Sequence, residues 1–329
     1  MSTPRQVVVT GMGMVTPIGF DEETFWSHLV EGRTGIDRIR QIDVSDYKVK
    51  IGAEVDSERL SAALNERGLF ALDRTVDMGL LASNVALEQA GLIEGEPPYS
   101  KSNVAALFGT GAGNGHSYWD AYMRFEEMRV KGIRPTTIPR LMANSVSAQI
   151  SMRFGLTGPN YVTVCACSSA SVAIGTGYRL IKDGYADTAL CGGTEAIFDF
   201  GTFGGWNKLG VLSKNPDPER ACRPFDEARD GCVLGEGAGA LVLESAERAR
   251  ERRASVRAEI IGYAESSDAV HLTRPDPEGQ ARTIRLALAS AGLEPGDVGF
   301  INAHGTATKA NDACEGESIR LAFGEARRI

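Results

Sequence analysis

The chain has 329 residues, of which 43% are hydrophobic and 24% charged, as is typical of a globular protein with a sizeable core. The formal net charge of −8 argues against partners such as nucleic acid or an anionic membrane surface. No apolar run approaches the roughly eighteen residues of a membrane span, and six irregularly spaced cysteines indicate reduced thiols. With a strand predicted from Gln6 and hence no room for a signal peptide, we expect a cytoplasmic protein.

Strand-like and helical patterns alternate along the first part of the chain. We predict strands at Val7–Thr10, Val104–Phe108, Tyr161–Val164 and Thr188–Leu190, and helices at Arg74–Ala90 and Ser169–Lys182. This alternation indicates an α/β fold with a largely parallel sheet covered by helices.

Cys167 lies at the bend between a predicted strand and the helix that begins at Ser169. A thiol at a helix N-terminus faces unpaired backbone N–H groups and the positive end of the helix dipole, which lowers its pKa and makes it nucleophilic. Ser168 or Ser169 is expected to cap this helix, and Gly184 to end it. A buried, inert cysteine is the alternative interpretation.

Two segments follow the same pattern of helix end, turn, apolar strand and glycine-containing loop. They are Ala86–Gly111 and Ala287–Thr306, in which Gly91 and Gly292 occupy matching positions and are predicted to end equivalent helices. A spacing of about 200 residues is too long for a solenoid and indicates a duplicated domain, with a chance match as the alternative.

A second chemical cluster lies in the segment Phe300–Asp312. The apolar residues before His304 predict a short strand that delivers the imidazole into a cleft, where it could move a proton or stabilise an oxyanion. Thr306 and Thr308 would present their hydroxyls on the same side of an extended segment, suited to the amides of a long polar ligand. A structural histidine in a turn is the alternative.

The segment Arg223–Gly239 has a charged start and a glycine-rich end. We interpret it as a buried turn in which four charged side chains pair among themselves, namely Arg223, Asp226, Arg229 and Asp230. Buried ion pairs usually satisfy hydrogen bonds rather than carry out catalysis, so this turn is expected to be architectural.

Five motifs occur in a fixed order along the chain. They are ACSS around Cys167, GGTEA at Gly192–Ala196, RPFDEARDGCVLGEGAG from Arg223, SSDAVHLTRPDP at Ser266–Pro277, and NAHGTATKAND at Asn302–Asp312. Together they resemble the β-ketoacyl-[acyl carrier protein] synthases of the elongating type, found in type II fatty acid and polyketide pathways. The resemblance runs from Val7 to the end of the chain.

This resemblance implies a thiolase fold, an α/β arrangement of two similar βαβ-type halves in layers α-β-α-β-α. We expect an N-terminal half at residues 1–250 and the start of a C-terminal half at residues 251–329. The family's second histidine, in a Lys…Gly-His motif, and a later glycine-rich loop have no counterpart, because His28, His116 and His271 match neither. We therefore expect an incomplete second half, a fragment rather than a naturally short chain, and no competent condensing enzyme from these residues alone.

The resemblance also implies the chemistry. Cys167 would take an acyl group as a thioester, malonyl on a carrier protein would lose CO₂, and the carbanion would attack the thioester. The neutral imidazole of His304 would stabilise the enolate oxygen during decarboxylation. No metal and no cofactor are expected, since the substrates are attached to the phosphopantetheine arm of the carrier protein.

Several residues match substrate-binding positions of the family. Thr306 and Thr308, and also Thr273, match positions that hold the phosphopantetheine arm, and Trp206 matches an aromatic position beside the malonyl site.

The acyl pocket of the family includes the loop Gly109–Gly113. Ala112 stands where a larger apolar residue often closes the pocket floor, and Thr137 where a bulky residue of the partner subunit often closes it across a dimer interface. The two small residues predict a longer or wider tunnel, suited to a polyketide or polyene chain.

Acyl carrier protein is the expected partner, docked on local basic residues that include Arg67 and Arg74, with contributions from Lys208 and Lys214. Basic residues that serve only solubility are the alternative interpretation. A dimer is also expected, either with an identical chain or with a related ketosynthase-like subunit. One alternative stays open, that of a non-catalytic partner resembling a chain-length factor, although such subunits lack the nucleophile. The contexts of cysteine hydrolases and the G-x-G-x-x-G fingerprint are absent, and Cys165 with Cys167 makes a poor zinc site.

Overall fold

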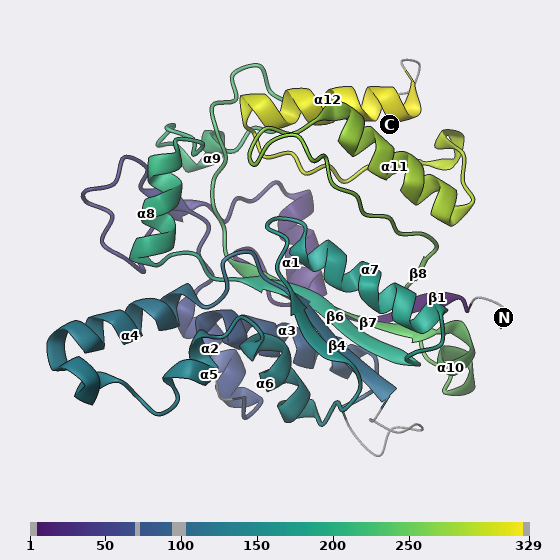
Figure 1. The fold of residues 1–329 in the computed structure, drawn as a ribbon, viewed down its shortest axis with the longest axis horizontal. Helices are drawn as coiled ribbons and strands as arrows, with labels where there is room; N and C mark the ends of the chain where they lie inside the picture. The colour runs from purple at the N-terminus through teal and green to yellow at the C-terminus, as the bar shows by residue number, and fades with distance from the viewer. Residues whose placement is uncertain (1–4, 70–72, 94–102, 325–329) are drawn as a thin grey trace. The chain divides into compact units, whose positions relative to one another are not determined.

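The computed structural model describes residues 5–69, 73–93 and 103–324 (Figure 1). Its residues form two compact units, which are described separately. The first unit comprises Met1–Ser45, Gly52–Gly205 and Leu234–Ile260, and the second comprises Asp46–Ile51, Trp206–Val233 and Ile261–Ile329.

The first unit is built on a six-stranded sheet in the order β5-β4-β6-β7-β1-β8. Its strands are β1 (Val7–Val15), β4 (Val104–Gly109), β5 (Asn160–Thr163), β6 (Thr188–Glu195), β7 (Gly237–Ser245) and β8 (Ala258–Ile260). Only β4 pairs in parallel, with β5 and β6, whereas the β6–β7, β7–β1 and β1–β8 pairs are antiparallel. The prediction of a largely parallel sheet is therefore wrong, because a buried apolar run has the same sequence in either strand direction. A short ribbon pairs β2 (Asp37–Arg38) with β3 (Ile51–Gly52).

The first unit also contains several helices. They are α1 (Glu22–Val30), α2 (Ser57–Glu66), α3 (Arg74–Gln89), α4 (Gly115–Met128), η2 (Arg129–Gly132), α5 (Thr137–Leu141), α6 (Ser145–Phe154), α7 (Ser169–Lys182) and α10 (Ala246–Glu251). The helix α8 (Phe200–Leu209) begins in the first unit and ends in the second.

The helices α3 and α7 cover opposite faces of the sheet (Figure 1). On β6, a methyl group at Gly193 would lie 2.5 Å from the Cβ of Ala170 in α7, whereas the next residue, Thr194, donates a hydrogen bond to the carbonyl of Thr75 in α3. Successive residues of a strand point to opposite faces, so the two helices must lie on different sides. The nucleophile candidate therefore precedes a helix that rests directly on the sheet.

An apolar core joins α3 to the sheet. Its members include Met78 and Leu81 of α3 together with Phe108, Leu190 and Val242 of three strands, none more than 2% exposed. Burial of each such side chain contributes about 1.5–3 kcal/mol, so this core fixes the ends of the strands that carry the site.

The second unit contains α9 (Pro218–Ala221), α11 (Pro277–Ala291), η3 (Pro295–Asp297) and α12 (Lys309–Phe323). The helices α11 and α12 lie side by side (Figure 1), and a hydrogen bond of 2.8 Å joins Ser318 of α12 to Gln280 of α11. The short strand predicted before His304 is absent from the described residues, where the segment Val298–Ala303 is irregular. An apolar run becomes a strand only beside a partner that satisfies its backbone, and no described strand pairs with this one.

The predicted repeat is confirmed at its helix ends. Gly91 after α3 and Gly292 after α11 both adopt left-handed φ angles, of 70° and 68°. In each case the glycine N–H and the following leucine N–H bond to carbonyls of the last helical turn. Within the described residues, no helix is both long and apolar enough to cross a bilayer.

Candidate active site

Cys167 lies in a tight turn between β5 and α7, as predicted. The preceding residue, Ala166, has a φ angle of 52°, a left-handed conformation that is unfavourable for a residue with a side chain. The thiols of Cys165 and Cys167 are both exposed, and none of the six cysteines, all of which are described, forms a disulfide. The fold thus holds a strained turn that presents Cys167 ahead of a helix.

The two serines that follow Cys167 brace this turn rather than cap the helix. Ser168 occupies the N-cap position of α7 without a side-chain cap bond, and its hydroxyl donates instead to the carbonyl of Cys165 at 2.8 Å. The hydroxyl of Ser169 accepts from the N–H of Cys165 at 2.8 Å and lies 3.1 Å from the carbonyl of Thr110. The expected side-chain cap is therefore wrong, since the serine hydroxyls are engaged by the turn. The other end is as predicted, with α7 ending at Lys182 just before Gly184.

The loop after β4 is held by Glu195, the last residue of β6. The N–H groups of Gly111 and Ala112 both donate to the Glu195 carboxylate, and so does the hydroxyl of Thr110. Burial raises the pKa of Glu195, and the hydrogen bonds from this loop partly offset that effect. Glu195 belongs to one of the five motifs, but the sequence analysis gives it no role. The signal that could have found it is an acidic residue at the end of a buried strand.

The other two pocket candidates of the first unit lie in or beside short elements. Ala112 is exposed, and its position is set by the hydrogen bonds of its own N–H group to Glu195. Thr137 is the first residue of α5, and its hydroxyl accepts a hydrogen bond of 3.1 Å from the N–H of Arg134.

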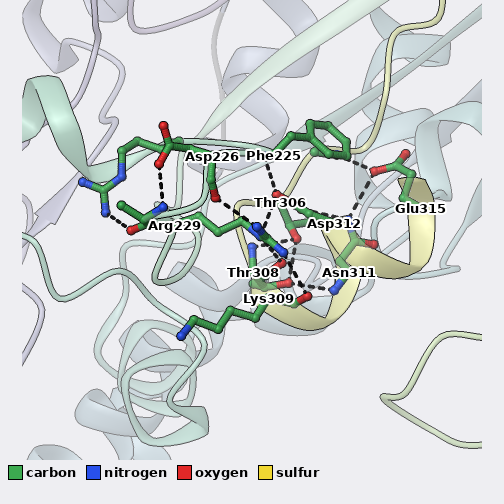
Figure 2. Close-up of polar contacts among 12 residues, drawn as sticks. Phe225, Asp226, Arg229, Thr306, Thr308, Lys309, Asn311, Asp312 and Glu315 are labelled. Carbon is green, nitrogen blue, oxygen red and sulfur yellow. Dashed lines mark hydrogen bonds and ion pairs between the residues drawn. The ribbon is translucent and has the colours of Figure 1, made fainter. Parts of the chain in front are cut away.

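In the second unit, Glu315 of α12 grips the backbone at His304. The N–H of His304 donates to one carboxylate oxygen of Glu315 at 2.7 Å, and the N–H of Gly305 donates to the other at 2.9 Å. The amide of Asn311 supplies a further hydrogen bond to the same carboxylate (Figure 2). Sequence reasoning missed Glu315. Its position on the helix becomes informative only when the loop that carries His304 is known to fold back onto that helix.

The hydroxyls of the two threonines that follow His304 lie on the same side, as predicted. The hydroxyl oxygens of Thr306 and Thr308 are 2.9 Å apart, and Figure 2 shows them pointing toward one another. The segment is not extended, because Ala307 between them has a φ angle of 61°. Thr308 also caps α12 by accepting a hydrogen bond from the N–H of Asn311. A hydroxyl pair is therefore held ready at a helix N-terminus.

Asp312 connects the histidine segment to the charged turn. Its Oδ2 accepts a hydrogen bond of 2.7 Å from the N–H of Phe225 and lies 3.5 Å from the Nε of Arg229 (Figure 2). The side chain of Asp312 is 1% exposed and that of Arg229 is 18% exposed. A charge buried this deeply requires its partner, so Asp312, also missed from sequence, fixes the two segments together.

The charged turn only partly pairs as predicted. Arg223 and Asp230 form an ion pair of 3.1 Å. Arg229, however, donates to the backbone carbonyl of Asp226, whose carboxylate instead accepts from the N–H of Ala228. The expected pairing among all four side chains is wrong because Arg229 finds the more deeply buried carboxylate described above.

Thr273 and Trp206 are the remaining candidates. Thr273 is exposed in the loop before α11, and its N–H donates to Nδ1 of His271 at 3.1 Å. Trp206 is half-buried in α8. Cys167, Ala112 and Thr137 thus lie in the first unit, and His304, Thr306, Thr308, Thr273 and Trp206 in the second.

The predicted docking bases differ in availability. Arg74 forms a 2.6 Å ion pair with Glu236, whose side chain is fully buried, and Arg74 itself is only 15% exposed. Its expected docking role is therefore wrong, because the guanidinium is already used inside the first unit. Arg67 lies beside Glu66 and Glu88, whereas Lys208 and Lys214 are exposed.

Comparisons with known proteins agree along the whole chain. The family model described as "Beta-ketoacyl synthase, N-terminal domain" matches residues 4–249, and "Beta-ketoacyl synthase, C-terminal domain" matches residues 257–329. The chain is 37% identical to 3-oxoacyl-[acyl-carrier-protein] synthase 2 of Staphylococcus aureus (strain COL), covering 100% of this chain and 79% of that protein. It is 39% identical to the protein of the same name from Synechocystis, covering 97% of this chain and 77% of that protein.

Solved structures show the same likeness. The ishigamide ketosynthase/chain length factor superposes with a TM-score of 0.89 at 32% identity, covering 98% of this chain and 79% of that one. A β-ketoacyl synthase from Burkholderia phymatum gives a TM-score of 0.86 at 30% identity, covering 97% and 78%. The AntDE:AntF complex, described as a type II polyketide acyl-carrier protein with its ketosynthase, gives 0.88 at 27% identity, covering 98% and 79%.

These likenesses confirm the predicted α/β thiolase fold, and the match of the C-terminal domain shows that the second half of the fold is represented in the chain. The sequence motifs, the turn that presents Cys167 and both domain matches lead to one conclusion. The chain belongs to the β-ketoacyl synthase family, and it is an acyltransferase-class ketosynthase that lengthens acyl chains by Claisen condensation.

Proposed function

We propose that Cys167 is the nucleophile of this condensation. Its thiolate attacks the carbonyl carbon of an acyl thioester, and the thiol of the phosphopantetheine arm leaves. The observation that supports this role is the exposed thiol on a strained turn directly before α7. A turn stiffened by Ser168 and Ser169 keeps the sulfur in one place, which favours attack by a pre-oriented group.

The second step uses malonyl-[acyl carrier protein]. Loss of CO₂ leaves an enolate, whose carbon forms a bond with the acyl carbonyl carbon while the Cys167 thiolate leaves. The product is a β-ketoacyl chain two carbons longer. His304 donates a hydrogen bond to the enolate oxygen, and Glu315 acts as a positioning residue because it holds the backbone of the histidine turn.

The polar arm of the substrate is assigned to the threonines. The hydroxyls of Thr306 and Thr308 form a pair that can donate to and accept from an amide, and Thr273 adds a third hydroxyl. Trp206 is assigned to the malonyl site. Ala112 and Thr137 leave room for a long or wide acyl chain, so a polyketide or polyene substrate fits this pocket better than a short saturated chain.

The proposed partners are acyl carrier protein and a second ketosynthase-like subunit, identical or related. Two structural relatives support them, one complexed with an acyl carrier protein and one described with a chain length factor. A row of exposed apolar side chains on α4 offers a surface for a partner, formed by Tyr118, Trp119, Tyr122, Phe125 and Met128. No cofactor beyond the carrier-bound substrate is assigned, and a cytoplasmic location stays a prediction.

The proposal is tested by intact-mass measurement of the purified protein before and after incubation with acyl-loaded carrier protein. Cys167→Ala is compared with Cys165→Ala, which removes the neighbouring exposed thiol and serves as the matched control. We expect an added acyl mass in the wild type and in Cys165→Ala, and none in Cys167→Ala. An adduct on Cys167→Ala contradicts the assignment, because another group then takes the acyl chain. No adduct on the wild type favours a non-catalytic partner subunit.

The same preparation tests the second step. With malonyl carrier protein added, His304→Ala is expected to keep the acyl adduct but to stop releasing CO₂. Loss of the adduct with normal CO₂ release would mean that His304 serves acylation rather than decarboxylation.

A further inference from the structure

Glu195 accepts four hydrogen bonds from a single loop. Its Oε2 accepts from the N–H of Gly111 at 2.5 Å and from the N–H of Ala112 at 3.2 Å. Its Oε1 accepts from the same Ala112 N–H and from the hydroxyl of Thr110, both at 3.2 Å. Three consecutive residues of the loop after β4 are therefore tied to one carboxylate.

This carboxylate is stabilised by neutral donors alone. Within the described ranges no ion pair involves Glu195, and no charged neighbour contributes to the shift of its pKa. A partly buried anion without a cation is unfavourable compared with a neutral side chain of the same shape, unless its hydrogen bonds compensate. A carboxylate accepts hydrogen bonds on both of its oxygens, whereas a neutral amide of the same shape accepts on only one and places an NH₂ group at the other position.

The same loop lies against the turn that carries the nucleophile. A methyl group at Gly111 would lie 2.9 Å from Oε2 of Glu195 and 3.6 Å from the carbonyl of Ala166, so Gly111 fills the space between them. The Ser169 hydroxyl lies 3.1 Å from the carbonyl of Thr110 and 2.7 Å from that of Ala166. A series of polar contacts therefore runs from Glu195 through Thr110 and the Ser169 hydroxyl to Ala166, the residue before Cys167.

We infer that Glu195 is a positioning residue that sets acyl-chain selectivity, by fixing Ala112 and its loop against the nucleophile turn. The inference rests on the proposed function, in which Ala112 and its loop line the acyl pocket. It goes further because it names the group that fixes the position of this loop in the acyl pocket. Without the carboxylate the loop is free to move away from the turn, and the pocket then ceases to distinguish acyl chains by size.

The test compares Glu195→Gln with Thr194→Val. Glutamine keeps the shape of Glu195 but places an NH₂ group against loop N–H donors, whereas Thr194→Val removes a buried hydrogen bond of the same strand on the opposite face. Two quantities are measured on the full chain. They are hydrogen exchange of the Gly111 and Ala112 amides, and the ratio of Cys167 acylation rates from hexanoyl and tetradecanoyl carrier protein.

In Glu195→Gln we expect both amides to exchange about tenfold faster and the ratio of acylation rates to change by about fivefold or more, since hydrogen bonds to a charged group are lost. Thr194→Val should change neither quantity. Unchanged exchange, or faster exchange with an unchanged ratio, overturns the inference. A wild type that takes no acyl group refutes the proposed function instead. Thr110→Val, which removes one donor to Glu195, gives the same test if Glu195→Gln does not fold, with a smaller expected shift.

Discussion

Asp77 is a carboxyl group in an unfavourable place. It lies one turn into α3, and its Oδ1 is buried without a hydrogen-bond partner among the described residues. Burial raises the pKa of Asp77 to about 7, and the neighbouring Asp73 carboxylate adds to this effect, while Arg74 and Arg140 oppose it. The folded protein therefore holds a proton at Asp77 over a pH range in which the unfolded chain has lost it.

The sign of the resulting pH dependence follows from this difference. The unfolded pKa is near 3.8, so between about pH 4 and pH 7 the folded state binds more protons, and this group makes the protein less stable as pH rises. Asp77→Asn removes the free-energy cost of ionising this buried carboxyl group. We expect the substitution to stabilise the protein by up to about 4 kcal/mol at pH 8 and by little at pH 4.5. Urea unfolding of both proteins at the two pH values measures this. If the wild type and Asp77→Asn change in stability by the same amount between the two pH values, ionisation of Asp77 in the folded protein costs little free energy.

Individual site residues could be predicted from sequence where their own chemistry marks them. Cys167 and His304 stand in recognisable motifs, each at the end of an apolar run. Glu195, Glu315 and Asp312 could not be found in this way, because they act on backbone N–H groups, which every residue except proline carries. Only the folded path of the chain shows which amides a carboxylate reaches.

At the scale of elements, the close contact between α7 and the sheet depends on glycine, which has no side chain. A methyl group at Gly109 of β4 would lie 2.2 Å from the backbone carbon of Ser169 and 2.4 Å from the nitrogen of Ala170. Backbone atoms cannot rotate aside as a flexible side chain can. The first turn of α7, and with it the turn before it, therefore keeps its place because β4 ends in glycine.

Gly109→Ala tests this dependence. We expect it to lower the free energy of unfolding by about 1–3 kcal/mol through overpacking and to slow acylation of Cys167, since the start of α7 must shift. Gly239→Ala is the control, because that glycine also lies in the sheet, on β7, but has nothing within 4 Å of the added methyl group. Chemical unfolding and acylation rates measure the two effects. Equal behaviour of both variants would show that the α7 contact tolerates displacement.

Elements with local signals were predicted well, and those that depend on distant partners were not. The helices α3 and α7 begin at the predicted residues because apolar spacing and end signals lie within each segment. The directions of β7 and β1, and the absent strand at Val298–Ala303, depend on which strand lies alongside. The sequence of one strand does not by itself specify which strand pairs with it in the sheet.

For the whole molecule, the repeat of helix ends at Gly91 and Gly292 and the two family matches describe one duplicated fold. The boundary expected between residues 250 and 251 stays a prediction. The two compact units follow a different division, because residues 206–233 group with the segment that carries His304. One reason is visible in the ion pair between Arg229 and Asp312, which joins residues far apart in sequence within the second unit.

Net charge places a further constraint on the proposed carrier protein. A chain with a formal charge of −8 repels an acidic partner at long range, so attraction must come from local basic residues. Arg74 is unavailable for this purpose, and Arg67 has two glutamates beside it. The exposed lysines Lys208 and Lys214 therefore become the main candidates.

We expect kcat/KM for acyl carrier protein to fall as sodium chloride is raised, while reaction with a small uncharged acyl thioester stays constant, because salt screens charges between proteins. Charge reversal by Lys208→Glu or Lys214→Glu should raise the KM for carrier protein by about two- to fivefold, as expected for an exposed ion pair. Arg250→Glu on α10 makes the same change in total charge at another exposed residue, and should leave that KM unaltered. If Arg250→Glu has an equal effect, the total charge governs carrier binding. If no variant responds to salt or charge, docking must depend on apolar contacts instead.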